Sequence, residues 1–230
     1  MSHTPTVLVV DDEKALRDFV RRNLEVRNYH VVTAVNGLEA LSAFETQPID
    51  LVILDIMMPN LNGLETTRRI RQTSMVPIII LTALGDESDK VKAFDLGADD
   101  YLTKPFGTGE LLGRVKAVLR RARWAETVPE QESITCGEIV ADLAKHQVTL
   151  KGEPVEMTPT EFNLLVYLMK NSGKVLPHRM ILQHVWGPEY GEEAEYLRVY
   201  VGKLRQKIEA DPFHPTYIQT ERGIGYRFEQ

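Results

Sequence analysis

The sequence predicts a doubly wound α/β domain with a five-stranded parallel sheet, followed by a smaller α+β domain. Three observations predict this: short apolar runs alternate with helical patterns in the first half, the pattern changes in the second half, and a polar segment lies between them. The length of 230 residues suits one large or two ordinary domains. A content of 43% hydrophobic and 26% charged residues is typical of globular proteins and excludes collagen, low-complexity and wholly disordered chains.

The first half contains five strand-like runs rich in β-branched residues. Between them, apolar residues recur at helical spacing, as in Leu16, Phe19, Val20 and Leu24. Strands that alternate with helices predict a parallel sheet covered on both faces, because the crossovers are right-handed. Ligands bind beyond the carboxyl ends of the strands in such sheets. The expected strands are residues 6–10, 30–34, 50–54, 77–82 and 99–102.

The second half begins after a polar, acidic segment, residues 125–132, which we interpret as a linker between domains 1–124 and 133–230. Strand-like pieces at 134–143 and 147–155 precede three helical patterns, and strands at 216–220 and 226–229 end the chain. Thr158 is suited to cap the first of these helices, with Pro159 at its first position and Glu161 reaching back to the cap.

Charge and cysteine content bear on location and partners. The net charge is −6, which argues against a generally basic nucleic-acid-binding surface. The single cysteine, Cys136, excludes an internal disulfide and a cysteine-based zinc site. No secretory signal and no apolar run of about 20 residues is present, so we expect a cytoplasmic protein without a membrane partner.

Three carboxylates are expected to converge in the first domain. Asp11 and Asp12 follow the first strand and Asp55 follows the third, and these strand ends are near neighbours in a parallel sheet. Close carboxylates repel one another, and Mg²⁺ relieves this because it prefers oxygen ligands and pairs with phosphates. Lys104, after the fifth strand, and Thr82, at the end of the fourth, can contact phosphoryl oxygens.

This constellation predicts that a carboxylate attacks a phosphoryl group while a metal ion and a lysine neutralise its oxygens. Asp55 is the best nucleophile because it is the isolated acid of the three. The backbone carbonyl of Met57, in the loop that follows, is a further candidate metal ligand.

Four motifs in order, VVDDE, LVILDIMMPNLNG, IIILTA and GADDYLTKPF, resemble the receiver domains of two-component response regulators over residues 5–123. The resemblance implies phosphorylation by a sensor histidine kinase and a bound Mg²⁺. The implied roles are phosphoacceptor for Asp55, metal ligation for Asp12 and the Met57 carbonyl, water-mediated metal binding for Asp11, phosphate sensing for Thr82 and Lys104, and a rotating switch for Tyr101.

A helix is expected over residues 196–209, where Leu197, Val201, Leu204 and Ile208 form one apolar stripe. The same segment carries four basic residues and no acid up to residue 208. A solvated helix face is the alternative interpretation. Gly202 in mid-helix suggests either close packing or the close approach of another molecule such as DNA.

A hairpin pattern at residues 217–228 follows, with glycines near its tip. Together with the helix, it makes residues 133–230 resemble the winged-helix effector domain of the OmpR/PhoB type, and YLRVYVGKLRQKIE and TERGIGYRF resemble its KdpE branch. The resemblance implies a recognition helix in the major groove of promoter DNA and a wing beside the minor groove. The candidate DNA contacts are Arg198, Tyr200, Lys203, Arg205, Lys207 and Arg222.

Charges of alternating sign occur between the fourth strand and the linker, and an ordinary solvated face is one interpretation. The resemblance instead implies a homodimer face that phosphorylation favours, with Lys90 paired with Glu110 and Asp100 paired with Arg114. It also implies that RNA polymerase is a partner and that the protein is a regulator rather than an enzyme.

Three other functions account for the sequence less well. A phosphohydrolase with an aspartyl-phosphate intermediate usually has a second acid two residues after the nucleophile, where this chain has Met57. A nucleotide-binding switch would need a GxxxxGK[ST] or GxGxxG motif, and neither occurs at a βα turn. A repressor that ignores phosphate would leave Asp11, Asp12, Asp55 and Lys104 unexplained.

Overall fold

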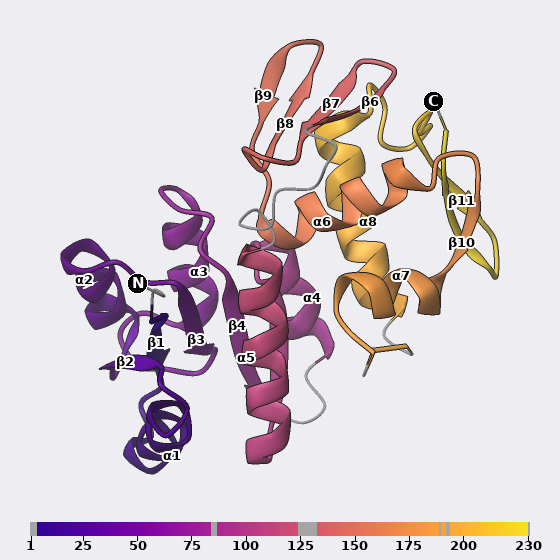
Figure 1. The fold of residues 1–230 in the computed structure, drawn as a ribbon. Coiled ribbons are helices and arrows are strands. Elements are labelled where there is room, and N and C mark those ends of the chain that lie inside the picture. The colour runs from indigo at the N-terminus through magenta and orange to yellow at the C-terminus, as the bar shows by residue number, and fades with distance from the viewer. Residues whose placement is uncertain (1–3, 84–86, 124–132, 189, 192–193, 230) are drawn as a thin grey trace. The chain divides into compact units, whose positions relative to one another are not determined.

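The computed structural model describes residues 4–83, 87–123, 133–188, 190–191 and 194–229, with the side chains of 87–90 and 123 left out of the description. The chain divides into two compact units, Met1–Leu119 and Arg120–Gln230 (Figure 1). The linker expected at residues 125–132 lies outside the described residues. Within the described ranges, no helix has the length and apolar character needed to cross a membrane.

The first unit is built on a parallel five-stranded sheet of order β2-β1-β3-β4-β5. This confirms the doubly wound α/β fold: the first two strands have the expected bounds, and the ends of the other three differ by one or two residues. The elements are β1 Thr6–Val10, α1 Lys14–Glu25, β2 His30–Ala34, α2 Gly37–Thr46, β3 Leu51–Asp55, α3 Gly63–Arg71, β4 Ile78–Ala83, α4 Glu87–Asp95, β5 Asp100–Lys104 and α5 Thr108–Arg123.

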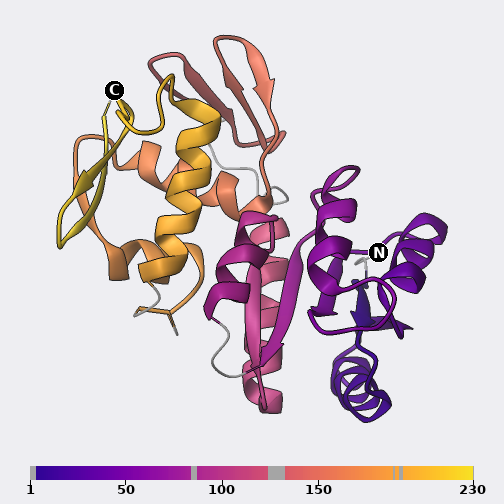
Figure 2. The same cartoon turned by 180° about the vertical axis from the view of Figure 1, so that it is seen from behind.

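Two helical layers cover this sheet, as the two opposite views show for α4 and α5 (Figures 1 and 2). The main apolar core joins alternate residues of the strands to α1 and α5, and all its members are buried. Helices α2, α3 and α4 contact one another in sequence order. Every residue of β3 is buried, because this central strand is covered on both faces.

In the part of the second unit that the structure describes, there are two antiparallel sheets and three helices. Its elements are β6 Ser133–Cys136, β7 Ile139–Asp142, β8 Gln147–Leu150, β9 Glu153–Val155, α6 Pro159–Lys170, β10 Val175–Pro177, α7 His178–Val185, α8 Ala194–Ile208, β11 Ile218–Glu221 and β12 Gly225–Phe228. Strands β6 to β9 form one sheet in sequence order, and the other has the order β10-β12-β11. The smaller α+β domain is therefore confirmed.

Two details differ from the expected strands. The pieces at 134–143 and 147–155 are each a hairpin of two short strands, because tight turns interrupt the apolar pattern. Strand β10 was not predicted from the sequence. It has three residues and pairs with β12 through Leu176 and Tyr226, so its existence depends on a partner 50 residues away.

Helix α6 begins with the predicted capping box. The Thr158 hydroxyl accepts a hydrogen bond from the Glu161 backbone N–H, and the Glu161 carboxylate accepts one from the Thr158 N–H at 2.8 Å. Both side chains are buried. The box therefore fixes the start of the helix that forms the centre of this unit.

Candidate functional site

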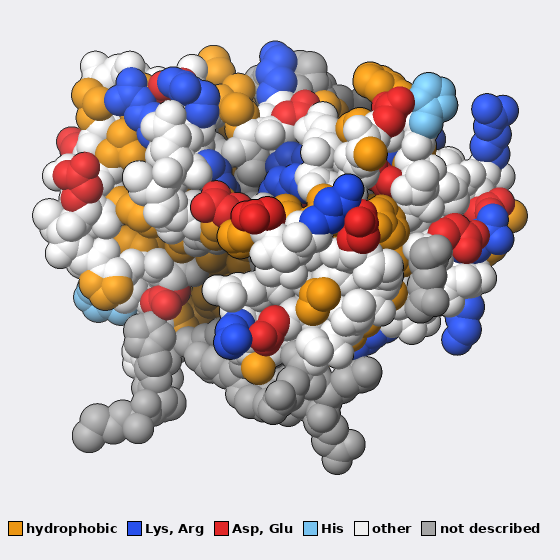
Figure 3. Space-filling view, turned by 90° about the horizontal axis from the view of Figure 1, so that it is seen from above, with side chains coloured by type: hydrophobic (Ala, Val, Ile, Leu, Met, Phe, Trp, Pro, Cys, Tyr) orange, Lys and Arg blue, Asp and Glu red, His pale blue; other side chains and the backbone are white. Residues whose placement is uncertain are grey.

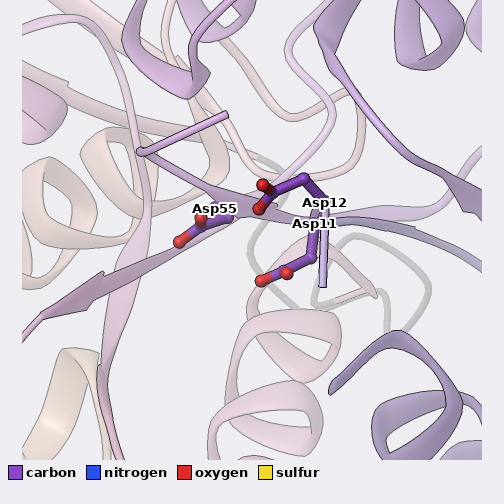
Figure 4. A group of neighbouring side chains, drawn as sticks. All are labelled: Asp11, Asp12 and Asp55. Carbon is purple, nitrogen blue, oxygen red and sulfur yellow. The ribbon is translucent and has the colours of Figure 1, made fainter. Parts of the chain in front are cut away.

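The three carboxylates predicted to converge do so at the carboxyl edge of the sheet. Val10 pairs with Leu54 across β1 and β3, so Asp11, Asp12 and Asp55 follow at the same edge (Figure 4). One oxygen from each lies within 4.8 Å of the others. Asp11 and Asp55 are buried, whereas Asp12 is exposed, so the cluster opens to solvent on one side.

Lys104 bridges two of these acids from the end of β5. Its Nζ lies 2.7 Å from Asp11 Oδ2 and 2.8 Å from Asp55 Oδ1. Burial raises the pKa of Asp55 above its ordinary value, although the hydrogen bond from Lys104 opposes this shift. Burial alone would lower the pKa of Lys104, but the hydrogen bonds to Asp11 and Asp55 outweigh it and raise that pKa. The ammonium group therefore stays charged at neutral pH.

The other predicted pocket residues lie on neighbouring segments. Thr82 is 2% exposed near the end of β4, one residue past the pairing of Asp55 with Leu81. Met57 lies in the loop after β3 with its side chain 73% exposed. Tyr101 on β5 is half-buried, and its ring contacts Phe94 edge to face at a centroid distance of 6.1 Å.

The donor set of this cluster fits a hard divalent cation. Three carboxylates supply oxygen ligands, and solvent access at Asp12 leaves room for the water molecules that Mg²⁺ retains. Histidine and cysteine, the ligands typical of zinc, are not members of this cluster. This arrangement can hold a cation beside the buried carboxylate of Asp55. The Lys104 ammonium contacts the same carboxylate.

In the second unit, α8 was expected to expose basic and aromatic residues. The predicted inner stripe of four apolar residues is buried. Tyr200, however, is 0% exposed and packs edge to face against Trp186 at 5.1 Å. The structure therefore corrects its assignment as an exposed DNA contact: the helix is rotated so that Tyr196 and Tyr200 belong to the core.

Three of the predicted basic contacts also bind within the unit. Lys207 Nζ lies 2.6 Å from Glu161 Oε2, and Lys203 Nζ lies 3.8 Å from Glu161 Oε1. Arg205 donates hydrogen bonds to the Ile218 carbonyl and to the Thr220 hydroxyl of β11. Burial lowers the pKa of the Arg205 guanidinium, which nonetheless remains charged. These three cations therefore stabilise the position of α8 within the second unit.

The exposed candidates are Arg198, paired with Glu195 on the surface, and Arg222 at the turn between β11 and β12. The exposed side of α8 also includes Val199, Gly202 and Gln206, which were not among the candidate DNA contacts although the position opposite the apolar stripe predicts their exposure. On the face shown in Figure 3, basic and acidic side chains interleave, as expected for a net charge of −6.

The predicted dimer-face residues have partners inside one chain. Arg114 lies 3.1 Å from buried Asp100 and 3.7 Å from Glu110, and its guanidinium lies 5.5 Å from the centroid of the Tyr101 ring. The pairing of Asp100 with Arg114, expected between two chains, is thus formed within one. The side chain of Lys90 lies outside the described residues.

Comparison with known proteins agrees with this geometry. Residues 7–116 match the response regulator receiver domain, and residues 152–228 match the C-terminal domain of transcriptional regulatory proteins. The transcriptional regulatory protein KdpE of Mycobacterium tuberculosis is 46% identical over 223 residues, which is 97% of this chain and 98% of the relative. The KDP operon transcriptional regulatory protein KdpE of Escherichia coli is 46% identical over 96% of this chain and 98% of its own.

A solved structure supports the same assignment. The response regulator DrrB of Thermotoga maritima, an OmpR/PhoB homologue, is 32% identical, with a TM-score of 0.53 over 99% of this chain and 100% of its own. Both halves of the chain therefore match known domains, and the relatives cover nearly its full length. The chain belongs to the two-component response regulators of the OmpR/PhoB type, and it is a phosphorylation-dependent transcription regulator similar to KdpE.

Proposed function

We propose that Asp55 accepts the phosphoryl group from a sensor histidine kinase and that the modified protein binds promoter DNA as a dimer. The observation that carries this proposal is the bridge from Lys104 to Asp11 and Asp55, at 2.7 and 2.8 Å, beside exposed Asp12. It combines a nucleophilic carboxylate with a fixed positive charge and two further acids suited to a metal ion.

In the transfer, a carboxylate oxygen of Asp55 forms a bond to phosphorus while the bond from phosphorus to the kinase histidine breaks and that nitrogen takes up a proton. Asp11, Asp12, Asp55 and the Met57 carbonyl would hold Mg²⁺. When bound, Mg²⁺ supplies positive charge next to the phosphoryl oxygens. Lys104 supplies the charge from the protein side, since its ammonium already contacts the acceptor.

Phosphorylation adds about two negative charges beside Lys104, whose ammonium lies 2.8 Å from the Asp55 carboxylate. We propose that Thr82 and Lys104 bind the new oxygens and that Tyr101 follows toward the space that Thr82 leaves. Tyr101 is half-buried, and Arg114 lies over its ring. A rotation of Tyr101 would therefore alter the surface formed by β5 and α5.

The effector half is proposed to place α8 in the major groove and Arg222 beside the minor groove. The proposed division is a receiver at 1–124, a linker at 125–132 and a DNA-binding domain at 133–230. Lys203, Arg205 and Lys207 serve first to position α8, and any phosphate contact they make is secondary. We propose RNA polymerase as a further partner and the cytoplasm as the location, because promoter DNA is found there.

We also propose that the protein is not an enzyme acting on separate substrates. Its chemistry is confined to phosphorylation of its own Asp55 and slow hydrolysis of the product. The rival phosphohydrolase usually carries an acid two residues after the nucleophile, and here the exposed side chain of Met57 occupies that position.

The direct test is the intact mass of the protein after incubation with Mg²⁺ and a small phosphodonor. Wild type is expected to gain the mass of one phosphoryl group and to bind promoter DNA more tightly. Asp55→Ala should gain nothing, because the acceptor oxygen is removed. Asp18→Ala, which removes a surface acid paired with Arg21, is the matched control and should behave as wild type. An equal gain in Asp55→Ala would place the modification elsewhere.

Dimer formation is expected to depend on Glu110, which is 46% exposed on α5. Reversing its charge in Glu110→Lys places it against Lys90 of the second copy and should weaken the phosphorylated dimer about tenfold or more, since like charges repel. Sedimentation velocity of the phosphorylated protein measures this. Adding Lys90→Glu should restore the dimer, and Glu45→Lys, on an exposed part of α2, should have no effect. Failure of the double variant to recover would refute this pairing.

A further inference from the structure

The exposed side of α8 is a narrow stripe centred on a glycine. Glu195, Arg198 and Gln206 are exposed, and Val199 and Gly202 are partly exposed, at helical spacings of three and four residues. Successive residues of a helix are rotated by about 100°, so Gly202 lies at the centre of this stripe with Arg198 and Val199 on either side of it.

Nothing in the described part of the chain explains a glycine at this position. A Cβ built on Gly202 would meet no heavy atom within 4 Å, so close packing within the unit is not the reason. Its backbone is ordinary α-helix, which alanine adopts more readily. Of the two explanations that the sequence left open, the structure favours the close approach of another molecule.

The neighbouring side chains determine the chemistry available there. Lys203 and Lys207 bind Glu161, and Arg205 binds the carbonyl of Ile218, so these three cations lean away from the stripe. Arg198 remains exposed at 61%, and its partner Glu195 is exposed at 71%. The centre of the stripe is therefore formed by the apolar side chain of Val199 and the bare backbone of Gly202.

We propose, resting on the DNA-binding role of α8, that Val199 and Gly202 form a notch for the C5-methyl group of a thymine in the major groove. That methyl is the apolar group which the major groove displays. Val199 and Gly202 lie about 4.5 Å apart along the helix axis, so a single base fits between them. Without a Cβ at Gly202, the helix backbone can approach the base edge.

Arg198 and Gln206 then contact base pairs to the two sides of this thymine, which are not both its immediate neighbours. They are about 12 Å apart along the helix, which corresponds to three or four base pairs. Arginine pairs best with the guanine O6 and N7 atoms, and glutamine with the adenine N6 and N7 atoms. The half-site is therefore inferred to hold a thymine between a guanine and an adenine that are three or four base pairs apart.

The test begins with the phosphorylated full-length protein and a random DNA library, from which bound sequences are enriched. Each thymine of the enriched site is then replaced singly by uracil, which removes only the methyl group. One position in each half-site should weaken binding about fourfold, corresponding to ~0.8 kcal/mol for one buried carbon group. This series uses the wild-type protein, so it does not depend on how a variant folds.

Gly202→Ala fills the notch and should lose both affinity for the thymine site and the difference between thymine and uracil. Its thermal unfolding temperature should equal or exceed that of wild type, which separates this effect from misfolding. Arg222→Ala is the matched control: it should weaken binding to both probes equally, because the methyl group lies in the other groove.

The outcomes are distinguishable. If the protein enriches no DNA, the proposed DNA-binding function fails and the notch fails with it. If it enriches a site at which no single thymine-to-uracil change matters, or if Gly202→Ala still distinguishes the two bases, the notch alone is overturned. Loss of discrimination only in Gly202→Ala supports it.

Discussion

Gly63→Ala is expected to slow phosphorylation of Asp55 about 100-fold, because it displaces the acceptor by a large fraction of an ångström. A Cβ at Gly63 would lie 2.1 Å from the carbonyl oxygen of Asp55 and 2.9 Å from the Cα of Ile56. Both are backbone atoms of the segment that carries the acceptor, so neither can move as a flexible side chain does. The Gly63 N–H also donates to the Ile56 carbonyl at 2.9 Å, and that turn would open.

The same substitution should lower the free energy of unfolding of the first unit by about 2–3 kcal/mol, the usual effect of overpacking. The measurements are the rate of mass gain with a small phosphodonor and urea unfolding followed by circular dichroism. Gly113→Ala on α5 is the matched control, since a Cβ there meets nothing within 4 Å. It should keep the phosphorylation rate and stabilise the protein by about 0.5–1 kcal/mol. Equal rates in the two variants would contradict the steric argument.

Glu161→Ala is expected to destabilise the second unit by about 3 kcal/mol. The Glu161 carboxylate is buried and accepts hydrogen bonds from Lys207 at 2.6 Å and from the Thr158 N–H at 2.8 Å. Its loss removes one of the two hydrogen bonds of the capping box, from the Thr158 N–H, and leaves the lysines of α8 without this acid. Since α6 and α8 pack together, the whole unit should be affected.

Trp186 offers a direct probe, because it is fully buried in this unit. Its fluorescence during urea unfolding, in a Trp124→Phe background, reports the stability of the second unit. Glu138→Ala is the control: it breaks an ion pair with Lys151 in which both side chains are more than half exposed. That loss should cost at most about 1 kcal/mol. A similar small loss in Glu161→Ala would show that the lysines find other partners.

Local patterns were sufficient to predict most of the fold. The alternation of β-branched runs and amphipathic helices depends on neighbouring residues, and it predicted the parallel sheet of the first unit. The capping box at Thr158 and Glu161 was predicted because its signals lie within four residues. Strand β10 was missed, since a three-residue strand is stabilised by the partner strand that tertiary folding brings to it.

The sequence pattern of α8 did not predict correctly which of its aromatic residues are buried. Its apolar stripe was predicted correctly, yet Tyr200 was expected to be an exposed DNA contact and is buried. Tyrosine can serve a core or an interface, and only the contact with Trp186 decides which. The same holds for Lys203 and Lys207, whose distant partner Glu161 lies on another helix.

The sequence by itself determined the class of each unit and the members of the acidic pocket, because strand order places the ends of β1, β3 and β5 at one edge. Only the tertiary structure decided that Lys104 bridges Asp11 and Asp55, that Arg114 pairs with Asp100 in the same chain, and which side of α8 is exposed. The physical reason is that periodicity reports whether a residue faces a core, whereas the partner of a charged or aromatic side chain is set by elements far away in the sequence.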